Sequence, residues 1–264
     1  MLVPLAPDRD AALARRNPVA KLAAAFVVTA GLLVTLDPVT PAVLLGLEVL
    51  AFPLSGVRVG VLLRRAWPLF VGIAGVAVAN VVAIGRGEVL ADLGPLEVTT
   101  GGLGTAASVS LRLLAVTLPG IVVLATTDPM DLADALVQRW RVPARFAYGA
   151  LAALRLLPLL SSDWHMIARA RRARGLDAGR SPVGALRAFA GQVFAVLVAA
   201  VRRGGRLAPA MEARGFGATD VERTVARPQP MRAGDWALVA ATVAAVLGAT
   251  AVSVAVGSWR LPFA

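Results

Sequence analysis

The stretch Trp236–Val256 reads "WALVAATVAAVLGATAVSVAV" and carries no charged residue over its 21 positions. About 20 consecutive apolar residues are enough for an α-helix to cross the hydrocarbon core of a bilayer. In that core every backbone polar group needs a partner within the protein, and a helix supplies these partners from its own residues. The stretch therefore predicts a transmembrane α-helix.

The composition of the whole chain agrees with this prediction. Hydrophobic residues make up 58% of the 264 positions, and the mean hydropathy is +0.73, above the level of a typical soluble domain. Four more apolar runs precede the quoted stretch: residues 20–36, 40–54, 68–84 and 105–127. The second of them is short and is interrupted by Glu48. We therefore predict an all-α polytopic membrane protein with about five transmembrane helices. Residues 58–67 are expected to form an interfacial turn, and residues 85–104 a Gly-rich linker.

Basic residues orient these spans. The connections on one side carry only Arg86. The N-terminal segment and the turn after the second run, on the other side, hold seven basic residues: Arg9, Arg15, Arg16, Lys21, Arg58, Arg64 and Arg65. Cytoplasmic loops of membrane proteins carry an excess of lysine and arginine. We therefore predict a multi-pass protein of the cell membrane whose N-terminus lies in the cytoplasm and whose chain returns there at Asp128.

Residues 128–233 differ from the rest of the chain in charge. They carry 17 arginines against 8 acidic residues, a net charge of +9 out of the +11 of the whole protein. The sequence therefore divides into three parts: residues 1–127 with a cytoplasmic segment and four transmembrane helices, residues 128–233 as a basic cytoplasmic module, and residues 234–264 with the final transmembrane helix and tail.

The basic module is predicted to contain three helices. The first starts with Thr127 or Asp128 as its cap and Pro129 at its first position, and it ends near Arg141. The second runs over residues 144–174 with a kink at Pro158, and the third starts at Ser181-Pro182 and runs towards Arg203. The stretch "GGRLAP" (204–209) is expected to interrupt the third helix before a short turn over 210–214.

A second topology gives six or seven spans. Residues 146–160 and 189–200 are apolar enough to be counted as spans, but they are only 15 and 12 residues long, and Arg155 interrupts the first. Amphipathic helices at the membrane surface fit these two stretches better.

The composition also argues against an enzyme. The chain has no cysteine and a single histidine, His165, which excludes thiolate and multi-histidine metal sites. Its only lysine is Lys21, and neither a phosphate-binding G-x-x-x-x-G-K-[ST] loop nor a G-x-S-x-G elbow occurs. We therefore expect a non-catalytic chain that binds no cofactor and no metal itself. Any energy for work must then come from another chain.

Arg112 lies inside the fourth apolar run. An arginine at mid-depth costs several kcal/mol on insertion scales. Two interpretations remain open: the side chain reaches the outer interface, or it makes a polar contact to a partner or to a neighbouring helix of the bundle.

The triplet Ala-Arg-Gly occurs twice in the basic module, as Ala173-Arg174-Gly175 and Ala213-Arg214-Gly215. The small neighbours leave each arginine unobstructed at a helix end, and a guanidinium group binds a carboxylate through two hydrogen bonds. Two such ends suit two similar grooves, as on a dimeric partner. A general attraction of the arginines to anionic lipid is the alternative. Nucleic acid is not expected as a partner, because no aromatic platform accompanies the basic residues.

Four segments carry a family resemblance in this order along the chain: "ATTDPMDLADAL" (125–136), "ALRLLPLL" (153–160), "ARARRARGLD" (168–177) and "AMEARGFG" (210–217). Together they resemble the transmembrane T component, EcfT, of energy-coupling factor transporters, the ABC-type importers of vitamins and of nickel or cobalt ions. The resemblance implies that two helices end in Ala-Arg-Gly and that each docks in a groove of one ATP-binding cassette ATPase subunit. ATP is then bound by these partner subunits, and a separate small membrane protein binds the substrate.

Mapped onto this sequence, the resemblance makes Arg174 and Arg214 the coupling residues, together with their neighbours Ala173, Gly175, Ala213 and Gly215. The alternative is a self-contained small membrane permease. A permease should show paired polar or broken spans around a site at the midplane. Apart from Glu48 and Arg112 the spans show little of this.

Overall fold

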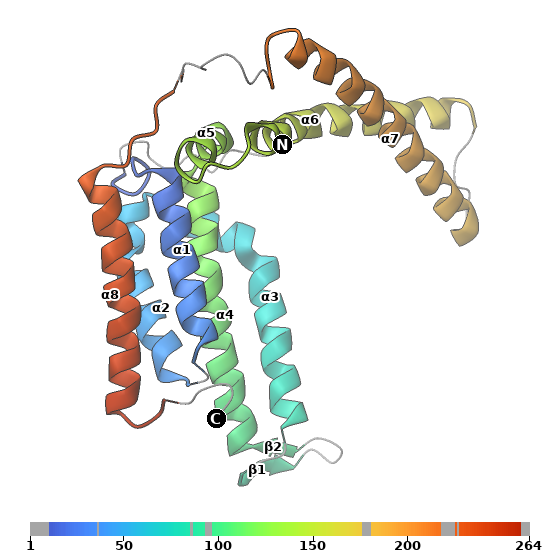
Figure 1. Cartoon of the computed structure of the whole chain (residues 1–264). Coiled ribbons are helices and arrows are strands. Elements are labelled where there is room, and N and C mark those ends of the chain that lie inside the picture. The colour runs from blue at the N-terminus through green and yellow to red at the C-terminus, as the bar shows by residue number, and fades with distance from the viewer. Residues whose placement is uncertain are drawn as a thin grey trace. The chain divides into compact units, whose positions relative to one another are not determined.

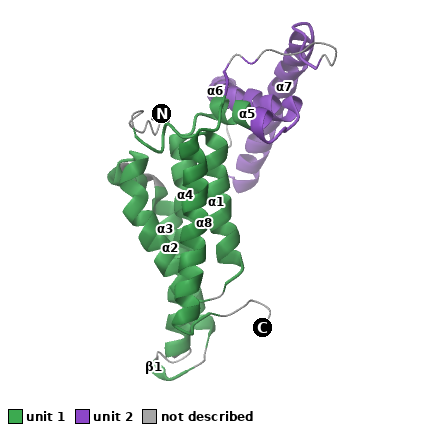
Figure 2. Ribbon diagram, turned by 60° about the vertical axis from the view of Figure 1, so that its left-hand side comes forward, with its two compact units in different colours: residues 1–135, 229–264 green, residues 136–228 purple. Residues whose placement is uncertain are grey.

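The computed structural model describes residues 11–35, 37–84, 87–92, 97–175, 181–217, 225 and 227–259. These residues are mainly helical, with one short β-hairpin among them (Figure 1). The chain divides into two compact units, formed by residues 1–135 with 229–264 and by residues 136–228 (Figure 2). The first unit therefore joins the N-terminal helices to the last helix of the chain.

The first unit holds the apolar helices of the N-terminal half and the last helix: α1 (Pro18–Leu33), α2 (Val39–Ala51) with a 3₁₀ turn η1 (Phe52–Ser55), α3 (Val59–Ala83), α4 (Thr100–Thr126) and α8 (Ala233–Ala255). Helices α4, α8, α7 (Pro182–Glu212) and the part Ala66–Ala83 of α3 are long and apolar enough to cross a membrane. Helices α1 and α2 are apolar but shorter. The predicted all-α polytopic membrane fold is confirmed. The placing of α7 at the membrane surface stays a prediction, because by length and composition α7 also qualifies as a span.

Local sequence explains where these helices start. The side chain of Asn17 accepts a hydrogen bond from the Val19 N–H at 2.9 Å, and Pro18 occupies the first position of α1. The Thr99 hydroxyl accepts from the Gly102 N–H at 3.1 Å at the start of α4. Such caps satisfy backbone donors that a helix leaves without partners in its first turn.

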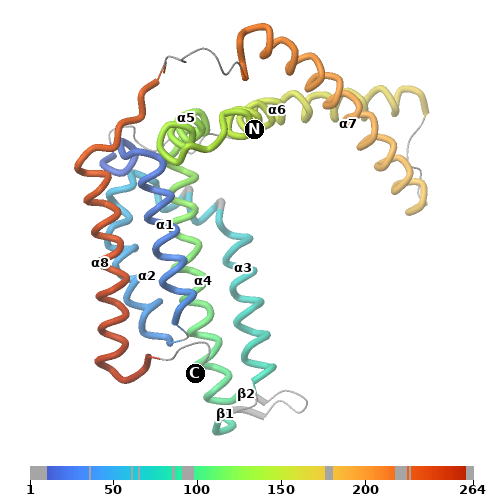
Figure 3. Tube along the Cα trace, in the orientation of Figure 1, coloured from blue at the N-terminus to red at the C-terminus, as the bar shows by residue number. Residues whose placement is uncertain are grey.

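Helices α1, α8, α2 and α4 form a four-membered ring, here named the helix ring. Helix α1 packs against α8 and α4, and α2 packs against the same two helices on the other side, while α1 and α2 scarcely touch. Figures 1 and 3 show these helices running lengthwise beside one another, with α3 packed on α4. The core of the ring is its aliphatic middle: Val28, Leu32, Leu44, Ala115 and Ala249.

Polar contacts close the helix ring at both ends. At one end the Asp37 carboxylate accepts hydrogen bonds from the Thr40 N–H and the Ser253 hydroxyl, both at 2.6 Å. At the other end the Lys21 Nζ donates to the Thr126 carbonyl at 2.9 Å, and the Asn17 N–H donates to Asp235 at 3.0 Å. The start of α1, the end of α4 and the start of α8 therefore meet through buried polar groups.

Two connections differ from the sequence prediction. Helix α3 begins at Val59 and continues through Pro68, so residues 58–67 are mostly helical rather than an interfacial turn. Part of the predicted linker 85–104 forms an antiparallel hairpin of β1 (Val89–Asp92) and β2 (Glu97–Thr99), and α4 starts already at Thr100. The Thr99 hydroxyl cap allows a helix to begin within the glycine-rich stretch.

The second unit is formed by the end of α5 (Pro129–Arg139), by α6 (Ala144–Ala173) and by α7. The predicted starts at Pro129, Ala144 and Pro182 are confirmed. The predicted interruption at residues 204–209 is wrong, because α7 runs unbroken to Glu212. Glycine weakens a helix by about 1 kcal/mol and an interior proline by about 3 kcal/mol, and Pro209 lies only three residues before the end of α7. Arg203, directly before this stretch, is held by Asp163 of α6.

Candidate functional site

The two Ala-Arg-Gly triplets lie at two helix ends, as the sequence predicts. Helix α6 ends at Ala173 and α7 ends at Glu212. Gly175 and Gly215 have φ angles of +71° and +77°, in the left-handed region that glycine adopts without strain. A left-handed glycine after the last turn is a common way to end a helix.

Two backbone hydrogen bonds recur at both ends, while the Arg174 N–H also donates to the Ala170 carbonyl at 3.3 Å. The Arg174 N–H donates to the Arg171 carbonyl and the Arg214 N–H to the Met211 carbonyl, both at 3.1 Å. The N–H of each following glycine donates to the carbonyl three residues before it, at 3.0 Å for Gly175 and 2.8 Å for Gly215. The same bonds fix each arginine directly before a left-handed glycine. Two helices of different sequence thus present an arginine on the same local frame.

All six residues of the triplets are exposed. Within the described part of the chain neither the Arg174 nor the Arg214 guanidinium has a hydrogen bond or an ion pair. A Cβ atom placed on Gly175 or Gly215 would meet nothing within 4 Å. These glycines are therefore required by the backbone angle and not by lack of space.

Helices α6 and α7 pair in antiparallel fashion, so the two triplets lie at opposite ends of the pair. The ring of Phe216, just beyond the second triplet, packs edge-on against Tyr148 near the start of α6, with ring centroids 6.2 Å apart. The first triplet lies at the far end of α6, where Arg174 follows Tyr148 by 26 residues. At 1.5 Å per residue the arginine-bearing ends are separated by about 40 Å along the helix.

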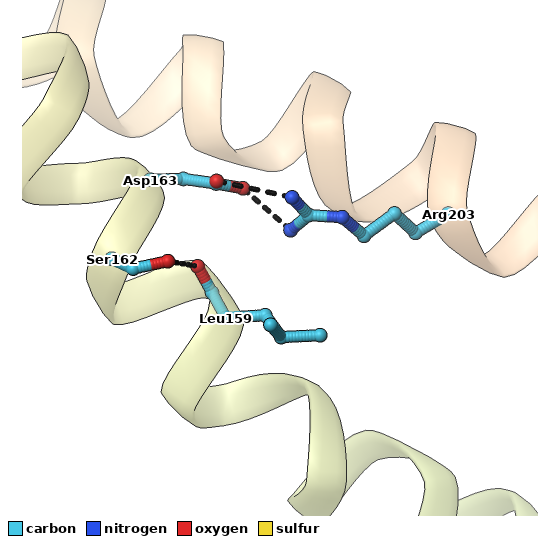
Figure 4. A network of polar contacts seen from close by, with 4 residues as sticks. All are labelled: Leu159, Ser162, Asp163 and Arg203. Carbon is cyan, nitrogen blue, oxygen red and sulfur yellow. Dashed lines mark hydrogen bonds and ion pairs between the residues drawn. The ribbon is translucent and has the colours of Figure 1, made fainter.

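An interhelical clamp holds α6 and α7 together; it consists of Asp163, Trp164, Phe189, Gln192 and Arg203. The Arg203 guanidinium binds the Asp163 carboxylate through two hydrogen bonds of 2.5 and 3.0 Å (Figure 4). The Gln192 side chain donates to the Trp164 carbonyl at 2.9 Å, and the rings of Trp164 and Phe189 pack edge to face at 5.6 Å. The sequence analysis missed this clamp. Its signal is that Asp163 is the single acidic residue of a helix with five arginines.

Arg112 lies in α4 of the first unit and takes no part in the triplets. Its side chain is half-buried, and its Nε and Nη2 atoms are buried without a hydrogen-bond partner among the described residues. The Asp37 carboxylate is the acidic group whose charge acts on it. The sequence analysis did not identify Asp37, Thr40 or Ser253, since single polar residues at the ends of apolar runs carry no distinctive pattern. An intramembrane polar contact of Arg112 stays a prediction.

The chemistry available at the triplets is binding. Two exposed, unpaired guanidinium groups can each donate hydrogen bonds to a carboxylate or to carbonyl oxygens in a groove of a partner. Among the described residues no group of three or more histidine, cysteine, aspartate or glutamate side chains is placed to hold a metal ion.

Comparison with known proteins gives one family. The family model described as CbiQ, "Cobalt transport protein", matches residues 10–225, a range that includes both triplets. An energy-coupling factor transporter transmembrane protein EcfT from Heliobacterium modesticaldum is 31% identical over 243 residues, covering 88% of this chain and 90% of the relative. The protein of the same name from Limosilactobacillus fermentum is 29% identical over 242 residues, covering 89% and 90%. EcfT 1 of Listeria monocytogenes is 30% identical over 171 residues, covering 62% and 64%.

The family match extends over the apolar helices α1 to α4 and over both arginine-bearing ends, so the likeness concerns most of the chain. They identify a membrane-embedded transport component rather than a catalytic chain. The chain therefore belongs to the CbiQ/EcfT family, the transmembrane components of energy-coupling factor transporters.

Proposed function

We propose that this chain is the scaffold through which two ATP-binding cassette ATPase subunits drive a separate, small substrate-binding membrane protein. Arg174 and Arg214, with Ala173, Gly175, Ala213 and Gly215, dock onto the ATPases, one triplet to each subunit. ATP is bound and hydrolysed by those subunits, and the scaffold itself holds no cofactor. The transporter lies in the cell membrane with the N-terminus of this chain in the cytoplasm.

The observation that carries the proposal is the likeness of the two helix ends. Their glycine φ angles differ by only 6°, from +71° to +77°, and their capping bonds follow one pattern. Equal local frames suit equal grooves, and a separation of about 40 Å along α6 is too large for one groove to bind both arginines. Two similar partner subunits account for both facts.

Transmission of motion requires that the two ends move together. The interhelical clamp supports this, because Asp163 and Arg203 join α6 to α7 at mid-length while Tyr148 and Phe216 join them near the second triplet. A displacement of either end is then passed along both helices, since packed helices shift as rigid elements.

The transported compound is expected to be a vitamin or a metal ion such as cobalt or nickel, selected by the separate binding protein. The description of the matching family, "Cobalt transport protein", supports a metal ion, and the names of the relatives support an energy-coupling factor transporter. With one histidine and no cysteine in its sequence, this chain has few ligands of its own for such an ion.

Purification of the native complex tests the proposal. The chain is tagged, the native membrane is solubilised in mild detergent, and the co-purifying proteins are identified by mass spectrometry. We expect two ATPase subunits, identical or paired, and a small multi-span protein whose identity indicates the substrate. A chain that purifies alone, from a preparation in which other membrane complexes stay intact, would contradict the proposal and favour a self-contained permease.

A further inference from the structure

A cavity of about 350 Å³ lies inside the helix ring, between α1, α2, α4 and α8. Its wall is mainly aliphatic and includes Val28 and Leu44 of the ring core, Leu118 from α4 and Ala245 from α8. Cavities of this size, with apolar walls and a few polar groups, are typical of sites for small molecules. The proposed coupling residues lie elsewhere in the chain and leave this cavity without a function.

Glu48 on α2 is the exceptional group in this wall. Both of its carboxyl oxygens are buried, and neither has a hydrogen-bond partner among the described residues. A buried carboxylate without a donor is strongly unfavourable. Acidic residues within membrane segments normally face a cavity or a partner. The Glu48 carboxyl is therefore free to accept a hydrogen bond from a molecule in the cavity.

Lys21, the other charged residue in the wall, is not that donor. Its Nζ donates to the Thr126 carbonyl at 2.9 Å, to the Thr126 hydroxyl at 3.3 Å and to the Ala14 carbonyl at 3.3 Å. An ammonium group has three donors, and these three bonds use all of them. The cavity thus offers an acceptor in Glu48 and no free donor from Lys21.

We propose that the cavity binds an amphiphile whose head is a primary ammonium group. The head donates hydrogen bonds to Glu48, and the aliphatic wall encloses the apolar part. A ligand with an anionic head would face the Glu48 carboxyl and would find no free hydrogen-bond donor on Lys21. Two sources share this chemistry: a small free amine, and a membrane phospholipid with an amino head group.

The chain offers a clean way to test this, because it contains no cysteine. Thr242 and Thr250 both lie on α8, and each hydroxyl donates to the carbonyl four residues earlier at 2.9 Å. Thr242 lines the cavity, whereas Thr250 is not one of the described residues that line it. Thr242→Cys therefore reports on the cavity, and Thr250→Cys is its matched control.

The full-length variants are placed in nanodiscs of phosphatidylcholine and modified with two methanethiosulfonates, the cationic 2-aminoethyl and the anionic 2-sulfonatoethyl reagent. The ratio of the two rates is measured, because an altered thiol pKa affects both reagents equally. We expect this ratio at position 242 to exceed that at position 250 by about tenfold, as a nearby acidic group attracts the cation. Glu48→Gln should bring the ratio at position 242 down to that of the control.

A ratio at position 242 that Glu48→Gln leaves unchanged overturns the proposal. So does a Thr242→Cys thiol that reacts only after denaturation, since the cavity would then be closed. Thermal unfolding and gel filtration of Glu48→Gln show whether the variant is folded, and Gln keeps the volume of the side chain.

Protection of the Thr242→Cys thiol distinguishes the two sources. Octylamine should slow its modification in phosphatidylcholine nanodiscs, while octanoate of the same chain length should not. Slower modification in phosphatidylethanolamine nanodiscs without added amine assigns the site to the phospholipid. Protection by octylamine alone assigns it to a free amine. Protection by octanoate, or by none of these molecules, contradicts an ammonium-binding cavity.

Discussion

Gly175 and Gly215 occupy the same backbone conformation at the ends of two different helices, with φ angles of +71° and +77°. Each stands directly after an exposed arginine, and each donates its N–H to the carbonyl three residues earlier. The equivalence concerns backbone geometry, which is more specific than a repeated triplet in a chain rich in alanine, arginine and glycine. The predictions on Arg174 and Arg214 follow from it.

Reversing the charge of either arginine should weaken binding of the ATPase subunits. Arg174→Glu and Arg214→Glu each place a carboxylate where the proposed groove holds one, and breaking such a charged pair typically costs about 2–5 kcal/mol. The double variant should abolish uptake while membrane insertion persists. Co-purification of the ATPases with the tagged chain measures the effect.

Arg172→Glu is the matched control for this prediction, since Arg172 is also exposed and lies two residues before Arg174, in the last turn of α6. If attraction to anionic lipid were the function, Arg172→Glu and Arg174→Glu would weaken activity alike. Arg174→Lys would then also be harmless, because a lysine keeps the charge but loses the planar fork.

The left-handed glycines should resist substitution. Gly175→Ala and Gly215→Ala force a side chain into a conformation that costs roughly 1–2 kcal/mol, although space around both positions is open. We expect the helix end to shift and ATPase binding to fall. Gly204→Ala inside α7 is the control, as its Cβ would also meet nothing and its φ is not left-handed. Thermal unfolding of that variant should show equal or higher stability.

Breaking the pair of Asp163 and Arg203 should uncouple the ATPases from transport. Asp163→Arg leaves both triplets intact, so the ATPases should still co-purify, while uptake falls because α6 and α7 no longer move together. The double change Asp163→Arg with Arg203→Asp restores an ion pair and should recover part of the uptake. Ser162→Ala should have little effect, because that hydroxyl bonds only to the Leu159 carbonyl of its own helix (Figure 4).

The hydrogen bond from Ser253 to Asp37 should stabilise the helix ring. Ser253→Ala removes a buried bond of 2.6 Å between α8 and the connection from α1 to α2. Interhelical bonds in membrane proteins contribute about 0.6 kcal/mol on average and at most about 2 kcal/mol. Thr250→Ala is matched to it, because its hydroxyl bonds within α8 only. Unfolding in a mixed detergent should separate the two, and equal midpoints would contradict a stabilising role.

Gly102 and Gly104 should differ in their tolerance to alanine. A Cβ atom on Gly102 would lie 2.9 Å from the Val81 carbonyl oxygen and 3.0 Å from that of Ile84, so the backbone of α3 would have to move. A Cβ atom on Gly104 meets nothing within 4 Å. Gly102→Ala should therefore destabilise the pairing of α3 with α4 by about 1–3 kcal/mol, and Gly104→Ala should not. Thermal unfolding of the two variants decides this.

The sequence predicted the helices well where an apolar run ended at a strong signal. Pro129 and Pro182 each start a helix where expected, and the glycines of both triplets lie where the helices end. The prediction failed at residues 58–67, which were expected to form a turn before a span starting at Pro68, and at "GGRLAP", which was expected to interrupt a helix. Helix α3 packs against α4 and α7 packs against α6, and a single sequence does not reveal these contacts.

The candidate site divides in the same way. The two triplets could be found in the sequence because they repeat. The clamp of Asp163 with Arg203 and the bond of Ser253 with Asp37 could not, because they join residues 40 and 216 positions apart. Such pairs depend on the crossing of helices, and the local pattern around each residue gives no sign of its partner.

The antiparallel pairing of α6 and α7 has a geometrical consequence. A half-turn about an axis perpendicular to two antiparallel helices exchanges their ends, so it brings one arginine-bearing end approximately onto the other. The two arginine-bearing ends of this pair are therefore related by an approximate twofold rotation. Dimers of like subunits usually have this same symmetry. On the proposed function, one asymmetric membrane protein can thus hold a symmetric pair of motors without having to form a dimer itself.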